Sequence, residues 1–257
     1  MDNLRHSPGF IGVDAARRAS LLPLRVAQIG LRIGSRSILE HIDFDLDGPG
    51  VTTVLGPNGA GKTVLLRILH GLLTPTTGRV SWNGNAPDAV RHRQGMVFQH
   101  PVMLQRSVRA NLAFVLRARG VARRERGQRM AQALSLGGLE RLATMPAPRL
   151  SGGERQRLAI ARAWVAQPDV MFLDEPTANL DPHGARSVET LIQHLSDAGC
   201  RLIVTTHDLG QARRLARDVL FLAGGRIHEQ AAAETFFAAS GPATPAAAAF
   251  LRGELID

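Results

Sequence analysis

The spacing of hydrophobic and polar residues predicts a chain in which strands and helices alternate. From about residue 22, apolar residues such as Val26 and Phe44 alternate with polar ones, as in short strands of an antiparallel sheet. The stretch 48–56 then predicts a strand that ends in a glycine turn. Apolar positions over 62–72 recur at helical spacing, so the order here is strand, loop and helix.

Further along the chain, short apolar runs predict strands that are separated by helical stretches. These runs lie at 95–99, 169–174, 201–205 and 218–223. Between the first two, the chain is rich in arginine and lacks strand-like alternation, so we expect helices roughly over 107–143. The pattern therefore predicts an α/β fold with a parallel-sheet core, an antiparallel β subdomain and an inserted helical subdomain.

This fold divides the chain into five expected segments. They are an N-terminal extension (1–21), the first part of the core with the β subdomain (22–99), the helical subdomain (100–166), the second part of the core (167–240) and a C-terminal tail (241–257). The extension lacks the basic-then-apolar order of a secretory signal. The tail is expected to be a loop that can hold one short helix.

The composition is that of a globular chain. Of its 257 residues, 44% are hydrophobic and 21% are charged, which argues against disorder. No stretch approaches the roughly 18 consecutive apolar residues of a membrane-spanning helix, so any membrane role is expected to be peripheral. The single cysteine, Cys200, precludes an internal disulfide and agrees with a reducing cytoplasm.

The net charge of +9 indicates an anionic neighbour, which is either nucleic acid or an acidic membrane surface. No aromatic residues are interleaved with the basic ones, as a stacking surface for nucleic acid would need. The arginine-rich run 117–129 is the strongest block of charge. It is either a solvated helix face, which is the more common case, or a contact with anionic lipid headgroups.

One glycine-rich stretch has the pattern G-x-x-x-x-G-K-[ST]. It consists of Gly56, Pro57, Asn58, Gly59, Ala60, Gly61, Lys62 and Thr63, and Lys62 is the only lysine in the chain. Glycines let successive N–H groups converge on a phosphate, the lysine reaches the β and γ oxygens, and the threonine hydroxyl is suited to bind Mg²⁺. Since a predicted strand and helix flank the stretch, we expect a phosphate-binding loop rather than an ordinary glycine turn.

Polar residues also follow three of the other predicted strands. Asp174 and Glu175 close the apolar run before them, Gln99 ends the strand before the helical insertion, and His207 ends a later strand. Open α/β sheets bind ligands at the carboxyl ends of their strands. We therefore expect Asp174 to bind Mg²⁺ together with Thr63, and Glu175 to polarise an attacking water.

The stretch LSGGE, residues 150–154, predicts the start of another helix. Ser151 and Glu154 have the spacing of a capping box, so a helix should begin here and run to about residue 166. Gly152 and Gly153 just inside this helix cost stability, up to about 1 kcal/mol each relative to alanine. Close approach of the backbone to an anion would explain the two glycines, and a plain capped helix is the alternative.

These motifs together resemble the nucleotide-binding cassette of ATP-binding-cassette (ABC) transporters over about residues 22–229. The combination of LSGGE (150–154) with LDEP (173–176) carries the resemblance. It implies a P-loop NTPase (RecA-like) core, ATPase activity, and ATP and Mg²⁺ as ligands. It also implies a role for each motif: Walker A at 56–63 with Val64 following, the Q-loop and a metal contact at Gln99, the signature at Ser151 to Glu154, Walker B at Asp174, the general base at Glu175, the D-loop at Asp181 and the switch at His207.

The resemblance further implies that two copies pair head to tail, so that the signature of one copy completes the site at the phosphate loop of the other. The expected partners are a second copy of the chain, a multi-span permease and, indirectly, a solute-binding protein, with no nucleic acid. The expected location is the cytoplasmic face of the plasma membrane.

The chain departs from the family pattern at two positions. Thr63 is followed by Val64 rather than a second hydroxyl residue, and Ile33 occupies the position of the usual adenine-stacking aromatic residue. Stacking is therefore expected to be weak or supplied by Arg32.

The prediction of which kind of ABC protein this is depends on less specific resemblances. Residues 100–104 resemble the importer segment that helps to form the groove for the permease, and LLRILHGLL, FQHPVMLQRSVRANLAF and AFLRGELI are most similar to the ATPase of tungstate-type oxyanion importers. Importers of phosphate, molybdate or amino acids remain alternatives. A soluble ABC ATPase that acts on nucleic acid or ribosomes is the alternative from another functional class. An exporter cassette is a third possibility.

Overall fold

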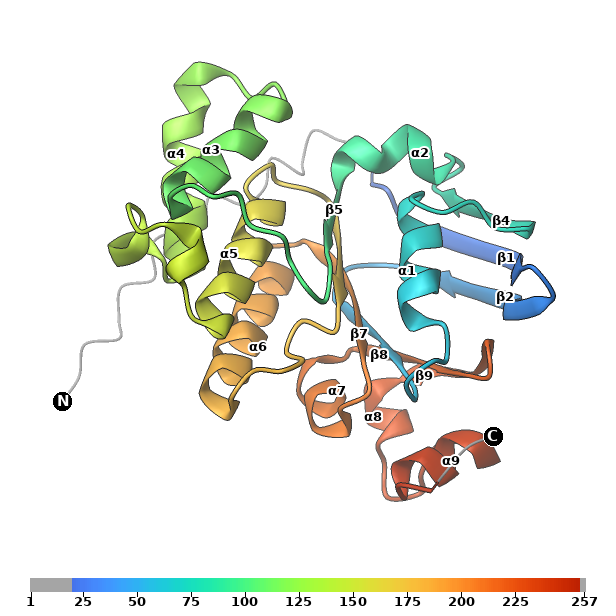
Figure 1. The fold of residues 1–257 in the computed structure, drawn as a ribbon. Helices are drawn as coiled ribbons and strands as arrows, with labels where there is room; N and C mark the ends of the chain where they lie inside the picture. The colour runs from blue at the N-terminus through green and yellow to red at the C-terminus, as the bar shows by residue number, and fades with distance from the viewer. Residues whose placement is uncertain (1–19, 255–257) are drawn as a thin grey trace.

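The computed structural model describes residues 20–254, and a six-stranded sheet runs through the middle of the molecule (Figure 1). Its strands lie in the order β5-β6-β7-β3-β8-β9, and every neighbouring pair is parallel except β8 and β9. The strands are β3 (Val51–Leu55), β5 (Gln94–Val97), β6 (Val170–Asp174), β7 (Arg201–Thr206), β8 (Asp218–Ala223) and β9 (Arg226–Ala232). The predicted parallel core is confirmed, and it brings the carboxyl ends of β3, β6 and β7 to one edge.

A second sheet of three antiparallel strands lies at the right of Figure 1. Its strands, in the order β2-β1-β4, are β1 (Leu24–Ile33), β2 (Arg36–Leu46) and β4 (Thr77–Trp82). Val26 faces Phe44 across the β1–β2 pair, and both side chains are buried. The alternation read from the sequence thus gives one buried face and one exposed face, and the predicted antiparallel element is confirmed.

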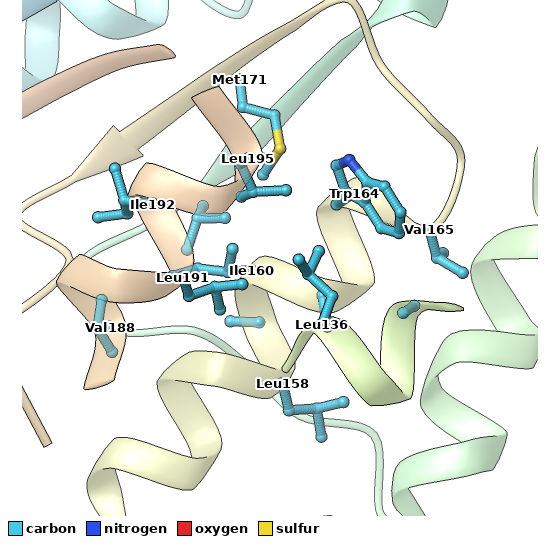
Figure 2. Close-up of a cluster of buried hydrophobic side chains, with 14 of the residues drawn as sticks. Leu136, Leu158, Ile160, Trp164, Val165, Met171, Val188, Leu191, Ile192 and Leu195 are labelled. Atoms are coloured by element: carbon cyan, nitrogen blue, oxygen red, sulfur yellow. The ribbon is translucent and has the colours of Figure 1, made fainter. Parts of the chain in front are cut away.

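Successive side chains of the central strands enter different cores, because a strand directs them to alternate faces. Phe172 of β6 packs in the core formed with α1 (Lys62–His70) and the three-stranded sheet. Met171 of the same strand packs on the other face, against α5 (Gly152–Trp164) and α6 (Pro182–Asp197). Figure 2 shows this second core, where Met171 gathers with Trp164 of α5 and Leu195 of α6.

The arginine-rich region forms helices, as the sequence predicts, at the left of Figure 1. They are α3 (Val108–Ala118), α4 (Arg123–Leu136) and the short 3₁₀ turns η3 (Glu140–Leu142) and η4 (Ala147–Arg149). Ser107 caps α3 by accepting a hydrogen bond from the N–H of Ala110. Asn111 is fully buried and donates to the carbonyl oxygens of 104, 106 and 107, so it ties the loop before α3 to that helix.

The C-terminal part adds three short helices, of which the first packs against β3 and β7 and the other two pack against β8 and β9. They are α7 (Leu209–Leu215), α8 (Ala233–Phe236) and α9 (Pro245–Leu251). The carboxylate of Glu229 accepts hydrogen bonds from the N–H groups of Ala243 and Thr244 ahead of α9. The ring of Phe250 lies 5.3 Å from that of Phe221, so the short helix expected in the tail is packed against the sheet.

The remaining elements and bounds differ slightly from the sequence prediction. The structure also has α2 (Pro87–Val90) and the 3₁₀ turn η2 (Arg91–Arg93), and α5 ends at Trp164 rather than near residue 166. Strand β5 ends at Val97, so Gln99 lies in the loop two residues beyond it, and β7 extends to Thr206. Within residues 20–254, no helix is long and apolar enough to cross a membrane. The N-terminal extension falls mostly outside the described residues.

Candidate nucleotide-binding site

The phosphate-binding loop joins the end of β3 to the start of α1. Its fold requires two glycines at close contacts: a Cβ atom on Gly56 would lie 1.9 Å from the carbonyl oxygen of Leu222, and one on Gly61 would lie 2.7 Å from Cδ2 of Leu39. Gly61 also has a φ of 101°, a left-handed conformation that favours glycine. The loop is therefore held by packing against β8 and β2, and α1 begins directly at Lys62.

Lys62 is buried, and its ammonium group is held by the loop itself. The Nζ atom donates to the carbonyl oxygens of Gly56 and Pro57, at 2.9 Å each, and lies 3.4 Å from Oε1 of Glu175. Burial lowers the pKa of Lys62, while the carboxylates of Glu175 and Asp174 oppose that change. A compact ammonium fits between two carbonyl groups, which a planar guanidinium would not do in the same space.

Asp174, at the end of β6, is fixed by two hydroxyl groups. Its Oδ1 atom accepts hydrogen bonds from Thr63 Oγ1 at 2.9 Å and from Thr205 Oγ1 at 2.8 Å. A carboxylate next to a threonine hydroxyl is the kind of oxygen donor set that Mg²⁺ prefers, so these residues fit that ion. Thr205 was not predicted from the sequence, because a threonine within a buried strand looks like any other β-branched residue.

Glu175 is the point on which several predicted residues converge. Its Oε2 accepts from Gln99 Nε2 at 3.3 Å, and its Oε1 lies 3.3 Å from His207 Nδ1 and close to Lys62 Nζ. Its φ of 43° is unusual for a residue other than glycine, and its N–H donates to Thr205 Oγ1 at 2.9 Å. One buried hydroxyl thus positions both Asp174 and Glu175.

These side chains border a cavity of about 690 Å³ at the carboxyl ends of the strands. Six residues that line it were not predicted: Ile38, Thr177, Ala178, Asn179, Thr206 and Asp208. Ile38 supplies an apolar wall from β2, and its place in an alternating strand carried no signal for that role. Thr177 accepts a hydrogen bond from the buried Gln211 at 2.6 Å, which holds the loop after β6 in place.

The signature residues do not line this cavity. Ser151 caps α5 through the predicted capping box, in which Glu154 N–H donates to Ser151 Oγ and Ser151 N–H donates to Glu154 Oε2. Asp181 instead caps α6, where its Oδ1 accepts from the N–H of Gly184 at 2.7 Å. Neither Asp181 nor the signature contacts Lys62 or Glu175 among the interactions of residues 20–254.

A match to a known sequence family identifies the family of this chain. Residues 39–178 match the family described as ABC transporter. The chain belongs to the ABC transporter family. It is an ATPase of this family.

Relatives and solved structures show the same kinship. The chain is 35% identical to the tungstate uptake system ATP-binding protein TupC of Peptoclostridium acidaminophilum, over 84% of this chain and all of that protein. It is 34% identical to the phosphate import ATP-binding protein PstB 2 of Natronomonas pharaonis, over 91% of this chain and 87% of that protein. The structure of cbiO1 from Clostridium perfringens, part of the ABC transporter complex cbiONQ, has a TM-score of 0.78 at 29% identity, over 84% of this chain and 91% of that one.

Proposed function

We propose that this ABC ATPase is the energy-supplying subunit of an importer for a small anion, of the tungstate or related oxyanion class. The observation that carries the proposal is the convergence of Lys62, Gln99 and His207 on Glu175, next to the Thr63–Asp174 pair. A carboxylate with this surrounding is suited to accept a proton from a water that attacks the γ-phosphate of ATP.

In the proposed mechanism, each residue has one task. Lys62 and the N–H groups of the phosphate-binding loop hold the phosphates, and Glu175 takes the proton of the attacking water. Thr63, Asp174 and Gln99 would hold Mg²⁺, which supplies positive charge to the phosphates when it is bound. His207 lies against Glu175 and would orient that carboxylate towards the γ-phosphate.

We also propose that the working unit is a head-to-tail homodimer on the cytoplasmic face of the membrane. The signature at Ser151, Gly152 and Gly153 lies outside the cavity of its own chain, which leaves it free to close the ATP site of a second copy. The N–H groups at the start of α5 and the positive end of that helix suit the γ-phosphate of the partner's ATP. Closing and reopening of this dimer would drive the permease.

The proposed solute rests on likeness to TupC, which matches this chain over the whole length of that relative. The chain also resembles a phosphate import ATP-binding protein at 34% identity, which supports phosphate as the nearest alternative. None of the residues at the ATP site is suited to contact the transported solute. Purification of the chain with its permease, followed by measurement of tungstate, molybdate and phosphate binding to the companion solute-binding protein, tests this part directly.

Replacement of Glu175 by glutamine tests the assigned base. Loss of the carboxylate should lower ATP turnover of the assembled transporter by about 100-fold or more, because general-base catalysis contributes roughly that much. ATP binding, measured by calorimetry, should persist. Unchanged turnover in the Glu175→Gln protein would show that another group accepts the proton.

Replacement of Lys62 by arginine tests the phosphate-binding loop. We expect ATP affinity to fall about tenfold or more, since a charge-assisted hydrogen bond is worth about 1.5–3 kcal/mol and the guanidinium does not fit the carbonyl cradle. The reverse change Arg67→Lys on the exposed face of α1 is the matched control and should leave affinity unchanged. Equal ATP affinity in the Lys62→Arg protein and the wild type would contradict the assignment.

A further inference from the structure

Glu175 is held more tightly by its backbone than by its side chain. The contacts of its carboxylate are long: Gln99 Nε2 and His207 Nδ1 each lie 3.3 Å from an oxygen, and Lys62 Nζ lies 3.4 Å away. The N–H of Glu175, in contrast, donates to Thr205 Oγ1 at 2.9 Å, which is a normal hydrogen-bond length. The position of the carboxylate in the cavity therefore depends on how its own backbone is fixed.

The backbone of Glu175 also has a conformation that needs support. Its φ of 43° lies in the left-handed region, which a residue with a side chain seldom adopts. Such a conformation persists only where the surrounding structure enforces it. The carbonyl oxygen of Glu175 accepts from the N–H of Ala178 at 3.1 Å, which is a contact within the same loop. The bond to Thr205 is different, because it links this loop to strand β7.

Thr205 is suited to support this backbone because its hydroxyl group is fixed on both sides. The residue is 0% exposed, and the pairing of β7 with β6 places it beside Asp174. A hydroxyl has one proton to donate and lone pairs with which to accept. The proton is donated to Asp174 Oδ1 at 2.8 Å, so a lone pair is left for the N–H of Glu175. The side chain of His207 is 50% exposed and is a less rigid support than this buried hydroxyl.

We propose that Thr205 is a positioning residue for ATP hydrolysis, which aims the carboxylate of Glu175 at the attacking water by holding the backbone of Glu175. This inference rests on the proposed function, in which Glu175 is the general base. Among the hydrogen bonds of residues 20–254, the hydroxyl of Thr205 makes none to Lys62 or to the phosphate-binding loop. The hydroxyl should therefore support the chemical step and add little to the binding of ATP.

Replacement of Thr205 by valine removes the hydroxyl and keeps the branched shape of the side chain. In the assembled transporter, we expect kcat for ATP hydrolysis to fall about tenfold or more, because a misplacement of about 1 Å at a reacting group costs on the order of 100-fold. ATP affinity of the full chain, measured by calorimetry in EDTA, should stay within about twofold of the wild type. Thr205→Ser restores the hydroxyl and should recover most of the turnover. Should the valine variant fail to fold, Thr205→Cys takes its place with the same expected direction, because a thiol is a weak hydrogen-bond partner.

Thr53→Val is the matched control for the loss of the hydroxyl. Thr53 lies in the neighbouring strand β3, is 1% exposed, and has an Oγ1 atom without a hydrogen-bond partner within residues 20–254. The same substitution therefore breaks no hydrogen bond there, and turnover should equal that of the wild type. An equal loss in the Thr53→Val and Thr205→Val proteins would mean that any change in the buried sheet lowers turnover, and the inference would be wrong.

A double-mutant cycle shows whether Thr205 acts through Glu175. Glu175→Gln removes the base, so adding Thr205→Val to it should lower single-turnover hydrolysis by less than about twofold, since there is no longer a carboxylate to misplace. A loss of the same size in the wild-type and Glu175→Gln backgrounds would show that Thr205 acts through another group, such as Asp174, and would contradict the inference.

The possible failures are distinguishable. If Glu175→Gln abolishes turnover while Thr205→Val hydrolyses ATP like the wild type, the assigned base stands and the positioning role is wrong. If Thr205→Val loses ATP affinity in EDTA, the residue supports the whole binding site rather than the base, which also refutes the inference. If Glu175→Gln keeps full turnover, the proposed function fails at its base, and the inference falls with it.

Discussion

His70, the last residue of α1, is a titratable side chain enclosed in the core. The residue is 6% exposed, and its ring packs edge-on against that of Phe172 with 5.6 Å between the ring centroids. Its Nδ1 atom has no hydrogen-bond partner in the described part of the chain. Burial lowers the pKa of His70 from 6.5 to about 4, and the nearby Arg91 and Arg119 add to the effect. The residue is therefore neutral in the folded protein at any physiological pH.

The low pKa of His70 predicts a loss of stability in acid. Between pH 6.5 and 4 the unfolded chain takes up a proton at this histidine and the folded chain does not, so the free energy of unfolding falls by about 1.4 kcal/mol per pH unit. The loss begins below pH 6.5 and is complete near pH 4. Urea unfolding at pH 7.5 and 5.5 should show that the wild type loses about 1 kcal/mol more than a His70→Gln variant. Parallel losses in the two proteins would contradict the prediction.

Some site residues could be predicted from the sequence because a short motif carries them. Lys62 and Thr63 lie in a fixed glycine pattern, and Asp174 and Glu175 close an apolar run. Thr205 could not be found in this way, because its role depends on the pairing of β7 with β6, which places it beside Asp174. A register between strands that are thirty residues apart leaves no local trace in the sequence.

At the scale of the element, the contact of α5 with α6 gives Gly153 a second explanation. A Cβ atom on Gly153 would lie 3.2 Å from the Cα atom of Gly184 in α6, whereas one on Gly152 would meet only the end of Leu180 at 3.4 Å. The sequence suggested that both glycines allow an anion to approach. The structure shows that Gly153 also lies at a close contact between two helices of one chain.

This difference predicts opposite effects for two neighbouring substitutions. Gly152→Ala should leave the isolated chain as stable as the wild type or slightly more so, because alanine favours the helix. Gly153→Ala should lower the free energy of unfolding by about 1 kcal/mol or more relative to Gly152→Ala, since the backbone of α6 must give way. Chemical unfolding of the two variants side by side measures the difference. Equal stabilities would show that the α5–α6 contact is loose.

The elements that the sequence did not predict share a physical cause. Strand β9 lies at the edge of the sheet and exposes every second side chain, and none of its residues is fully buried. Strand β4 has only two buried residues, Val80 and Trp82. A weak apolar pattern is enough for such strands because neighbouring strands supply their hydrogen bonds. The buried strands β6, β7 and β8, in contrast, have apolar runs from which they were predicted.

At the scale of the whole molecule, the phosphate-binding loop and the signature, which are the two halves of the proposed ATP site, lie apart. Lys62, Glu175 and His207 meet at one cavity, while the signature lies at the start of α5 outside it. The structure of one chain therefore leaves its own signature without a role at its own cavity. The proposed head-to-tail pair would resolve this, because each signature would then face the cavity of the other copy.

The composite site predicts that two inactive variants restore activity when they are mixed. Lys62→Arg disables the phosphate-binding loop, and Gly152→Arg blocks the signature at an exposed position where the fold has room. A mixed dimer contains one site with both changes and one site with neither. Half of the dimers in an equal mixture are mixed, so ATPase activity should reach about a quarter of the wild type if the sites act independently, while each variant alone is inactive. Full activity of Gly152→Arg alone would show that one chain completes its own site, and an inactive mixture would argue against the head-to-tail arrangement.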